Sequence, residues 1–317
     1  MKTDIKAELK GRWSSVLISI GFPDVIFSGK HQPCIYCGGK DRARWDRSKE
    51  FYFCGQCGPR QPIDMAMDWL NMPYKETALY LRPNKENFKM TATDAPDTAK
   101  NEARLKKIHA GLQRITPDSI AAKYFAGRGI TELPENDCYM HPGIDYYQDG
   151  KSIGKFPAIV SMFRNLAGET TTMHITYLSA EGKKLDVESP RKILPVIRPL
   201  PGSAIRLYPA TDVLCVAEGI ESALSVRMDT GMPVWAAGNA NNMAVMEIPD
   251  SVKHIVIYAD ADSSYVGQKA AYTLARKLKS KPGRESVTVV NLVDTQQVID
   301  KGVAFDFNDY MILKSNA

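Results

Sequence analysis

The chain has 317 residues, 44% of them hydrophobic and 24% charged, a composition typical of a folded globular protein with more than one domain. This composition excludes a collagen-like or wholly disordered chain. The best apolar stretch, residues 14–20, is too short to cross a bilayer, so we expect no membrane association. The N-terminus lacks the long apolar segment of a secretory signal, which predicts a cytoplasmic protein.

The formal net charge of +5 is unevenly distributed. Residues 1–85 contain 14 Lys and Arg against 9 Asp and Glu, so the whole surplus lies in the first quarter of the chain. A cation excess confined to one region is expected where that region contacts a polyanion such as nucleic acid.

The first quarter shows two helical patterns. Apolar residues spaced between Ile5 and Ile18 predict one helix that ends before Gly21, and a second helix begins at Pro62 and ends near Asn71. Residues 84–100 are small and polar, the composition of a linker. We therefore expect a first domain over 1–83.

Four of the six cysteines form two Cys-x-x-Cys pairs separated by 16 residues, and these are Cys34, Cys37, Cys54 and Cys57. This is the spacing of a tetrahedral four-thiolate zinc site. Disulfides or a redox dithiol are the alternatives, but the chain shows no export signal that would favour oxidation. The sequence therefore predicts a zinc ribbon with a structural Zn²⁺.

Cations and aromatic residues alternate between the two cysteine pairs. Cations neutralise phosphates and ring faces stack on unpaired bases, so the mixture predicts contact with single-stranded DNA. The residues assigned to this contact are Lys40, Arg42, Arg44, Trp45, Tyr52 and Phe53. In the alternative interpretation, Trp45 and neighbouring aromatic rings fill the core of a small β-ribbon and the charges are only solvated. One ring cannot easily serve both purposes.

Residues 101–210 read as an α+β region. Residues 101–128 predict two helices separated near Pro117, with Thr116 or Asp118 capping the second. Short β segments follow, at residues 158–163, 171–178 and 204–207.

The pattern changes again over 211–317. Apolar runs alternate with helical stretches near 220–229 and 265–279, which is typical of a parallel sheet with crossover helices. We expect a separate domain here.

Acidic residues follow the strands of this predicted sheet. Glu218 ends one apolar run, Asp260 and Asp262 end another, and Asp306 and Asp309 follow the last. Carboxylates that converge at the carboxyl edge of a parallel sheet provide the oxygen ligands that Mg²⁺ requires. Two such ions activate an attacking hydroxyl and stabilise the leaving oxygen in phosphoryl transfer. The alternative is that each acid only caps a helix or loop.

The order and spacing of these motifs resemble the TOPRIM domain of bacterial-type primases, topoisomerases and some nucleases. With a zinc ribbon in front, the chain is similar to the zinc-ribbon/TOPRIM primases of phages, satellite phages and plasmids. The matching segments are HQPCIYCGGKDRARWD, FYFCGQCG, AAKYFAGRGI, MHITYLSAEGKK, VAEGIESALSV, PVWAAGNANNM, YADAD and FDFNDY.

This resemblance implies a multi-domain α/β protein that synthesises RNA primers from NTPs on single-stranded DNA. It implies that Glu218, Asp260 and Asp262 are catalytic and bind Mg²⁺ or Mn²⁺, with Asp306 and Asp309 supporting a second metal or the nucleotide. The role of Glu221 stays open between an auxiliary magnesium ligand and a charge at the start of a helix.

A basic face is also implied by the resemblance. Lys184, Arg191 and Lys192 lie in or near its matching segments and are expected to bind phosphates of the template or incoming nucleotide.

Two other functions use the same residues. A TOPRIM nuclease would cleave phosphodiesters with the carboxylates, and a replication accessory protein would bind single-stranded DNA without catalysis. The sequence contains no G-x-x-x-x-G-K-[ST] motif. We therefore expect a helicase or replication initiator to act in trans.

Overall fold

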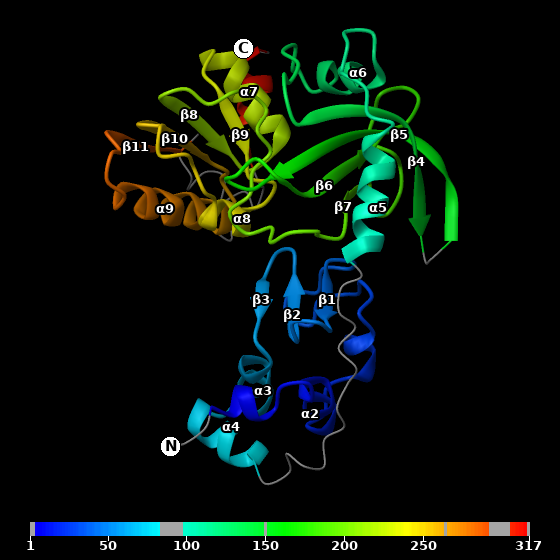
Figure 1. Ribbon diagram of the computed structural model, residues 1–317, viewed down its shortest axis with the longest axis vertical. Coiled ribbons are helices and arrows are strands. Elements are labelled where there is room, and N and C mark those ends of the chain that lie inside the picture. The colour runs from blue at the N-terminus through cyan, green and yellow to red at the C-terminus, as the bar shows by residue number, and fades with distance from the viewer. Residues whose placement is uncertain (1–3, 83–97, 149–150, 263–264, 292–304, 316–317) are drawn as a thin grey trace. The chain divides into compact units, whose positions relative to one another are not determined.

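The computed structural model describes residues 4–82, 98–148, 151–262, 265–291 and 305–315. The chain forms two compact units, residues 1–97 and 98–317, which are drawn in Figure 1. The predicted fold class is confirmed, since a four-cysteine region is followed by an α+β region and a parallel sheet. Among the described residues, no helix is both long enough and apolar enough to cross a membrane.

The first unit packs short helices around a small antiparallel sheet of order β1-β2-β3. Its elements are α1 (Ile5–Glu8), α2 (Trp13–Ser19), the 3-10 helix η1 (Asp24–Ser28), β1 (Ala43–Asp46), β2 (Phe51–Cys54), β3 (Gly58–Arg60), α3 (Pro62–Leu70) and α4 (Tyr74–Leu81). The helix predicted at Pro62 is confirmed, and it ends where Asn71 adopts a left-handed conformation.

The single helix predicted between Ile5 and Ile18 is wrong, because the chain breaks at Gly11, whose φ is 80°. The buried carboxylate of Glu50 accepts hydrogen bonds from the backbone N–H groups of Gly11 and Trp13, at 2.6 and 3.2 Å. Glu50 lies in the turn between β1 and β2. A distant residue therefore satisfies the start of α2, and no local pattern could have shown this.

Within its described residues, the second unit contains two four-stranded sheets. The first part consists of α5 (Thr98–His109), α6 (Ile120–Ala126), β4 (Cys138–Gln148), β5 (Lys151–Arg164), β6 (Thr170–Tyr177) and β7 (Arg191–Ile193). The second part consists of β8 (Val213–Ala217), α7 (Ile220–Thr230), β9 (Val234–Ala236), α8 (Ala240–Val245), β10 (His254–Ala259), α9 (Val266–Lys279), β11 (Ser286–Asn291) and α11 (Phe307–Ser315).

The antiparallel sheet, of order β4-β5-β6-β7, is covered on both faces. One face carries Ile159 and Phe163, which share a core with α6 and α7. The other carries Val160 and Ile175, which share a core with α5. Because side chains alternate along a strand, these two cores lie on opposite sides of the sheet.

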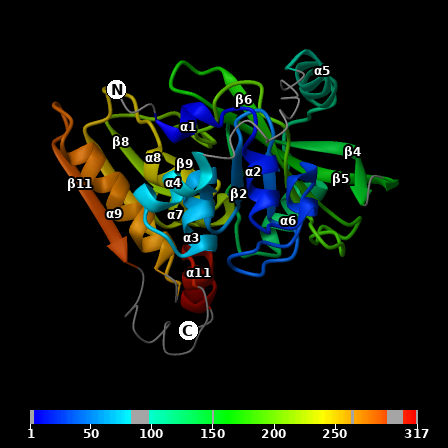
Figure 2. The same ribbon diagram turned by 90° about the horizontal axis from the view of Figure 1, so that it is seen from below.

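The parallel sheet has the order β11-β10-β8-β9 and helices on both faces. Leu214 and Ile257 pack with α8 and α9, whereas Cys215 and Tyr258 pack with α7 and α11. Figures 1 and 2 show α9 running alongside β11. This arrangement confirms the crossover pattern and brings the ends of β8 and β10 together, since these strands are neighbours.

Several local predictions are corrected. The second helix of the α+β region is capped by Ser119, whose hydroxyl accepts the N–H of Ala122, instead of Thr116 or Asp118. Residues 204–207 form only isolated bridges, and β4 lies where no strand was predicted. Of the predicted linker, residues 98–100 belong to α5, and 84–97 lie outside the described residues.

Candidate functional site

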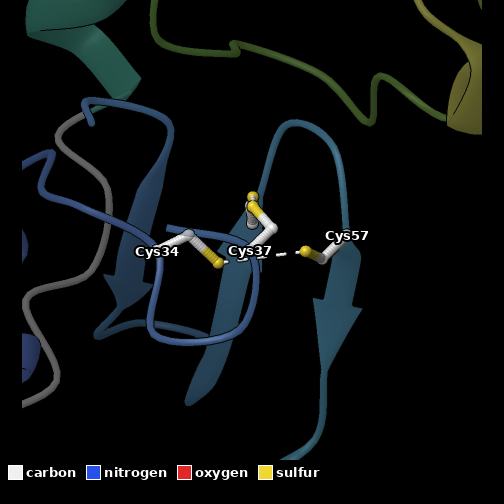
Figure 3. Close-up of side chains that lie close together, drawn as sticks. Cys34, Cys37 and Cys57 are labelled. Carbon is white, nitrogen blue, oxygen red and sulfur yellow. Dashed lines mark hydrogen bonds between the residues drawn. The ribbon is translucent and has the colours of Figure 1, made fainter. Parts of the chain in front are cut away.

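The four predicted zinc ligands converge. Cys34 Sγ lies 3.9 Å from Cys57 Sγ, Cys37 Sγ lies 3.7 Å from Cys54 Sγ, and all four sulfur atoms lie within 4.8 Å of one another. Figure 3 shows three of these thiols pointing toward a common centre. Four thiolates at the usual Zn–S distance of about 2.3 Å stand about 3.8 Å apart in a tetrahedron. The sulfur positions therefore fit Zn²⁺, and they are too far apart for disulfides.

The backbone around the first cysteine pair is folded toward sulfur. The N–H of Tyr36 donates to Cys34 Sγ at 3.4 Å, and the left-handed turn at Gly38 has a φ of 68°. Burial opposes ionisation of Cys34, but hydrogen bonds from the backbone of Cys37 and Tyr36 and from the Tyr52 hydroxyl lower its pKa to about 6. The Tyr52 hydroxyl also accepts the N–H of Ile35 at 3.1 Å. This buried side chain therefore helps to hold the loop that contains Cys34 and Cys37 in place.

The ribbon separates the predicted DNA-contact residues into two faces. In the register of β1 and β2, Trp45 pairs with Tyr52 and Arg44 pairs with Phe53. Trp45 and Tyr52 are 3% and 0% exposed and belong to the core, where Trp45 meets Phe27 edge-on at 5.0 Å. The assignment of these two rings to DNA stacking is therefore corrected, because no free ring face remains.

The opposite face of the ribbon keeps the remaining predicted residues. Arg44 is exposed, and Phe53 is partly exposed between Arg44 on β1 and Pro59 on β3. Lys40 and Arg42 are exposed in the loop before β1, and Arg42 hydrogen-bonds to Gln56. The outward face therefore combines the partly exposed ring of Phe53, two residues after partly exposed Phe51, with nearby cations.

The carboxylate edge, which we define as Glu218, Asp260, Asp262, Asp306 and Asp309, lies at the carboxyl ends of β8 and β10. Glu218 follows β8 and Asp260 follows β10. Asp306 joins them because Phe305 pairs with Ala261 in an isolated antiparallel bridge. Residues separated by 88 positions in the chain thus meet at one edge, as the topology predicted.

Glu218, Asp260 and Asp306 are partly exposed, and partial burial and the charges of neighbouring acids raise their pKa values. Burial raises the pKa of Glu218 to about 7, helped by the charges of Asp262 and Asp306 and opposed by a hydrogen bond from the backbone of Ala240. Burial, then the charge of Glu218, raises the pKa of Asp260 to about 8. The pKa of Asp306 is also raised by burial. No described Lys or Arg forms an ion pair with Glu218, Asp260 or Asp306.

Asp262 differs from Asp260 because β10 ends at Ala259. Its carboxylate accepts hydrogen bonds from the backbone N–H groups of Val266 and Gly267, at 3.3 and 2.9 Å, in the first turn of α9. A Cβ at Gly267 would lie 2.8 Å from the carbonyl oxygen of Asp260, so only glycine allows this approach. Asp262 therefore caps a helix while its charge still acts on Glu218.

Asp306 and Asp309 form a reciprocal cap at the start of α11. Asp306 Oδ1 accepts the N–H of Asp309 at 3.0 Å, and Asp309 Oδ2 accepts the N–H of Asp306 at 3.1 Å. Buried Asn308, which carried no signal in the sequence, donates to Ser225 on α7 at 3.0 Å. These contacts fix the position of Asp306 at the carboxylate edge.

Glu221, in the first turn of α7, is buried and has two side-chain partners. Its carboxylate accepts a hydrogen bond from Tyr124 at 2.6 Å and forms an ion pair with Arg191 on β7. Burial alone would raise the pKa of Glu221, but Arg191 and then Tyr124 lower it to about 2. Glu221 therefore links the antiparallel sheet to α7, and the structure gives it partners other than a metal. The role of Tyr124 could not be read from the sequence.

The three cations predicted to bind phosphate do not form one group. Burial and the charge of Arg191 lower the pKa of Lys184, and Glu221 and Asp306 are close enough to oppose this shift. Lys184 therefore lies within electrostatic range of Arg191, Glu221 and Asp306. Lys192 faces the other side of β7, where its Nζ donates to the carbonyl of Tyr147 at 2.6 Å. The expected single basic face is corrected because neighbouring residues of a strand point in opposite directions.

Two parts of the chain match known domains. Residues 213–317 match the Toprim domain, and residues 99–207 match a domain of unknown function, DUF7146. The parallel sheet and its carboxylate edge therefore lie in the region that matches the Toprim domain.

Solved primase structures also resemble the chain. The primase fragment of the bacteriophage T7 primase-helicase protein is 15% identical with a TM-score of 0.39, over 90% of this chain and 96% of that one. The Aquifex aeolicus primase (zinc binding and RNA polymerase domains) is 16% identical with a TM-score of 0.41, over 99% and 85%. A Pseudomonas aeruginosa DNA primase domain is 15% identical with a TM-score of 0.39, over 69% and 82%.

Proposed function

We propose that the protein is a DNA primase that makes short RNA primers on single-stranded DNA by metal-dependent nucleotidyl transfer. The observation that carries this proposal is the carboxylate edge, where Glu218, Asp260 and Asp306 share a partly buried site and form no ion pair with a described Lys or Arg. Its position in the region matching the Toprim domain supports the same proposal.

The residues at this edge fit a divalent metal. Buried carboxylates with raised pKa values bind protons when no other cation is present, and a hard divalent ion replaces those protons. Glu218, Asp260 and Asp306 would hold Mg²⁺ or Mn²⁺, while Asp262 and Asp309 support them from the helix caps. When bound, such ions activate a hydroxyl and stabilise charge during phosphoryl transfer.

Other residues of this unit then bind and orient the substrates. Arg191 is half-exposed, with 45% of its side chain accessible, and Lys184 lies nearby. We assign both to phosphates of the template or the incoming NTP. Glu221 and Tyr124 hold Arg191 in place, so we assign Glu221 a positioning role and not a ligand role.

The first unit is assigned to the template. A structural Zn²⁺ on the four thiolates fixes the ribbon, whose outward face presents Phe53 beside Arg44. An accessible ring and nearby cations suit single-stranded DNA. We further propose domains over 1–83, 101–210 and 211–317. The resemblance of the sequence motifs supports a primase of the phage, satellite-phage or plasmid kind, assisted by a helicase or initiator in trans.

The proposal is tested by incubating the full chain with single-stranded DNA, labelled NTPs and Mg²⁺ or Mn²⁺. We expect new labelled oligonucleotides whose formation requires the template and the metal. Shortened DNA without new oligonucleotides would favour a nuclease. DNA binding without either product would favour the accessory protein.

A further inference from the structure

A second cluster of cations surrounds a cavity on the α5 side of the antiparallel sheet. The cavity has a volume of about 570 Å³. Its charged and aromatic lining consists chiefly of Arg104, Lys107, Lys155, Lys192, Asp145 and Tyr147. Four of these side chains are cations and one is an acid, so the lining has a net positive charge.

The strand register separates this cavity from the carboxylate edge. Lys192 pairs with Ile175, whose side chain belongs to the core shared with α5. Arg191 pairs with Thr176 and reaches Glu221 on the opposite face. Residues opposite one another on paired strands share a face, so the cavity lies across the sheet from Arg191.

Three of the four cations lack an ion pair in the described part of the chain. None of Arg104, Lys107 and Lys155 forms one with a described carboxylate. Lys192 is held in place by the carbonyl of Tyr147 and by the ring of Tyr146, 4.0 Å from its Nζ. Cations that outnumber the acids of one cavity in this way are arranged for a ligand with several negative charges.

The shape and the rim indicate which ligand. The volume lies within the range of pockets that hold one small molecule, and Tyr147 is 49% exposed at the rim. An exposed ring provides a surface on which a base stacks. A passing nucleic-acid strand would instead require cations arranged along an open groove.

We propose that this cavity binds a nucleoside polyphosphate, with phosphates on the four cations and the base against Tyr147. The site is separate from the proposed polymerisation centre and does not depend on the function assigned there. It also needs no divalent metal, because its counter-charges are Lys and Arg side chains. The carboxylate edge, by contrast, repels phosphates until a cation is bound.

The test is the binding of a fluorescent ATP analogue to the full chain without added divalent metal. We expect saturable binding that Lys107→Glu and Arg104→Glu each weaken about tenfold or more. The matched control is Lys106→Glu, which reverses an exposed charge on the same helix outside the cavity lining and leaves binding unchanged. Because no divalent metal is present, this binding is measured apart from the proposed primase activity.

Competition identifies the ligand. Unlabelled ATP should displace the analogue better than tripolyphosphate, because the base adds contacts. Equal binding by wild type and both Lys107→Glu and Arg104→Glu would overturn the site. Displacement by a short single-stranded DNA at lower concentration than ATP would overturn the nucleoside polyphosphate as its ligand.

Discussion

The four-cysteine site and the carboxylate edge both gather metal-ligating side chains, but they do so in opposite ways. The thiols come from residues 34–57 and lie within 4.8 Å of one another. The carboxylates come from segments between residues 218 and 309, and no three of the described acidic residues meet the same limit. The four-cysteine cluster is thus encoded by local spacing, whereas the acidic site is encoded by the order of strands in a sheet.

The two sites also differ in what holds them together. Hydrogen bonds from the backbone and from Tyr52 stabilise negative charge at Cys34, whereas burial and the neighbouring thiols raise the pKa values of Cys54 and Cys57. At the carboxylate edge, burial and mutual repulsion oppose negative charge, and the pKa values of Glu218 and Asp260 rise to about 7 and 8. We therefore expect the first unit to need a bound Zn²⁺ for folding, whereas packing of the second unit holds its acids together against their repulsion.

The largest expected effect comes from a substitution in the four-cysteine site. Cys54→Ser should abolish zinc binding and unfold the first unit, because a structural zinc site of this type contributes about 10 kcal/mol or more to folding. The second unit should stay folded, since its cores contain no residue of the first. Zinc analysis and limited proteolysis measure both results, with Cys215→Ala as the control that keeps its zinc. A fully zinc-loaded Cys54→Ser protein would contradict this prediction.

Asp260→Ala breaks the carboxylate edge instead. Primer synthesis should fall by at least about 10³-fold, because a ligand for the activating metal is lost. Binding of single-stranded DNA should stay level or rise slightly, since negative charge has been removed. Primer assays and gel shifts test this, with exposed Asp212→Ala as the matched control. Wild-type synthesis by Asp260→Ala would show that this edge is not the active site.

Substitutions on the two faces of the ribbon should have different effects: the buried face should affect protein stability, and the outward face should affect DNA binding. Trp45→Ala removes a buried ring and should cost about 3–5 kcal/mol of unfolding free energy. Phe53→Ala removes an accessible ring and should weaken DNA binding by about 1–3 kcal/mol with little loss of stability. Denaturant unfolding and fluorescence anisotropy compare the variants. The assignment fails if Trp45→Ala impairs binding in a protein of unchanged stability.

Glu221→Gln should show whether Glu221 positions Arg191 or binds a metal ion. It leaves Arg191 without its charged partner and should destabilise the protein by about 1–3 kcal/mol at pH 6, a figure reduced because Arg191 is half-exposed. The folded pKa of about 2 lies below the ordinary 4.5, so this stabilisation is present above pH 4.5 and is lost as the pH falls toward 2. Urea unfolding at pH 6 and pH 3 should therefore show a shrinking difference from wild type.

Mg²⁺ affinity at the carboxylate edge should stay the same in Glu221→Gln, as in the control Glu188→Gln. A large loss of affinity in Glu221→Gln alone would restore the metal-ligand interpretation.

The smallest expected effect comes from removing the charge repulsion between Asp260 and the neighbouring carboxylates. The folded pKa of Asp260, about 8, exceeds its ordinary 3.8, so the folded state holds a proton that the unfolded state releases, and stability falls as the pH rises toward 8. Asp260→Asn should therefore be more stable than wild type by about 1–2 kcal/mol at pH 8 without added metal. Thermal melts at pH 5 and pH 8 should show a larger gain at pH 8 than at pH 5. Saturating Mg²⁺ should reverse it, and a pH-independent difference would contradict burial and charge repulsion as its cause.

The sequence alone determined the features that depend on local spacing or on strand order. The Cys-x-x-Cys pairs predicted the thiol cluster, because four ligands on two tight turns need little else. The alternation of apolar runs with helices predicted the parallel sheet and, through it, the meeting of Glu218 with Asp260. Carboxyl ends of parallel strands share one edge whatever the remaining packing is.

Only the tertiary structure decided which way individual side chains point. Trp45 and Phe53 are both aromatic residues of one ribbon, and Arg191 and Lys192 are adjacent cations of one segment. Their roles differ because a strand presents alternate residues to opposite faces, and the face that is buried depends on what packs against it. Glu221 likewise forms its ion pair with Arg191 because two distant segments of the chain pack together. Spacing along the chain fixes which residues can meet, whereas packing of whole elements decides which of them do.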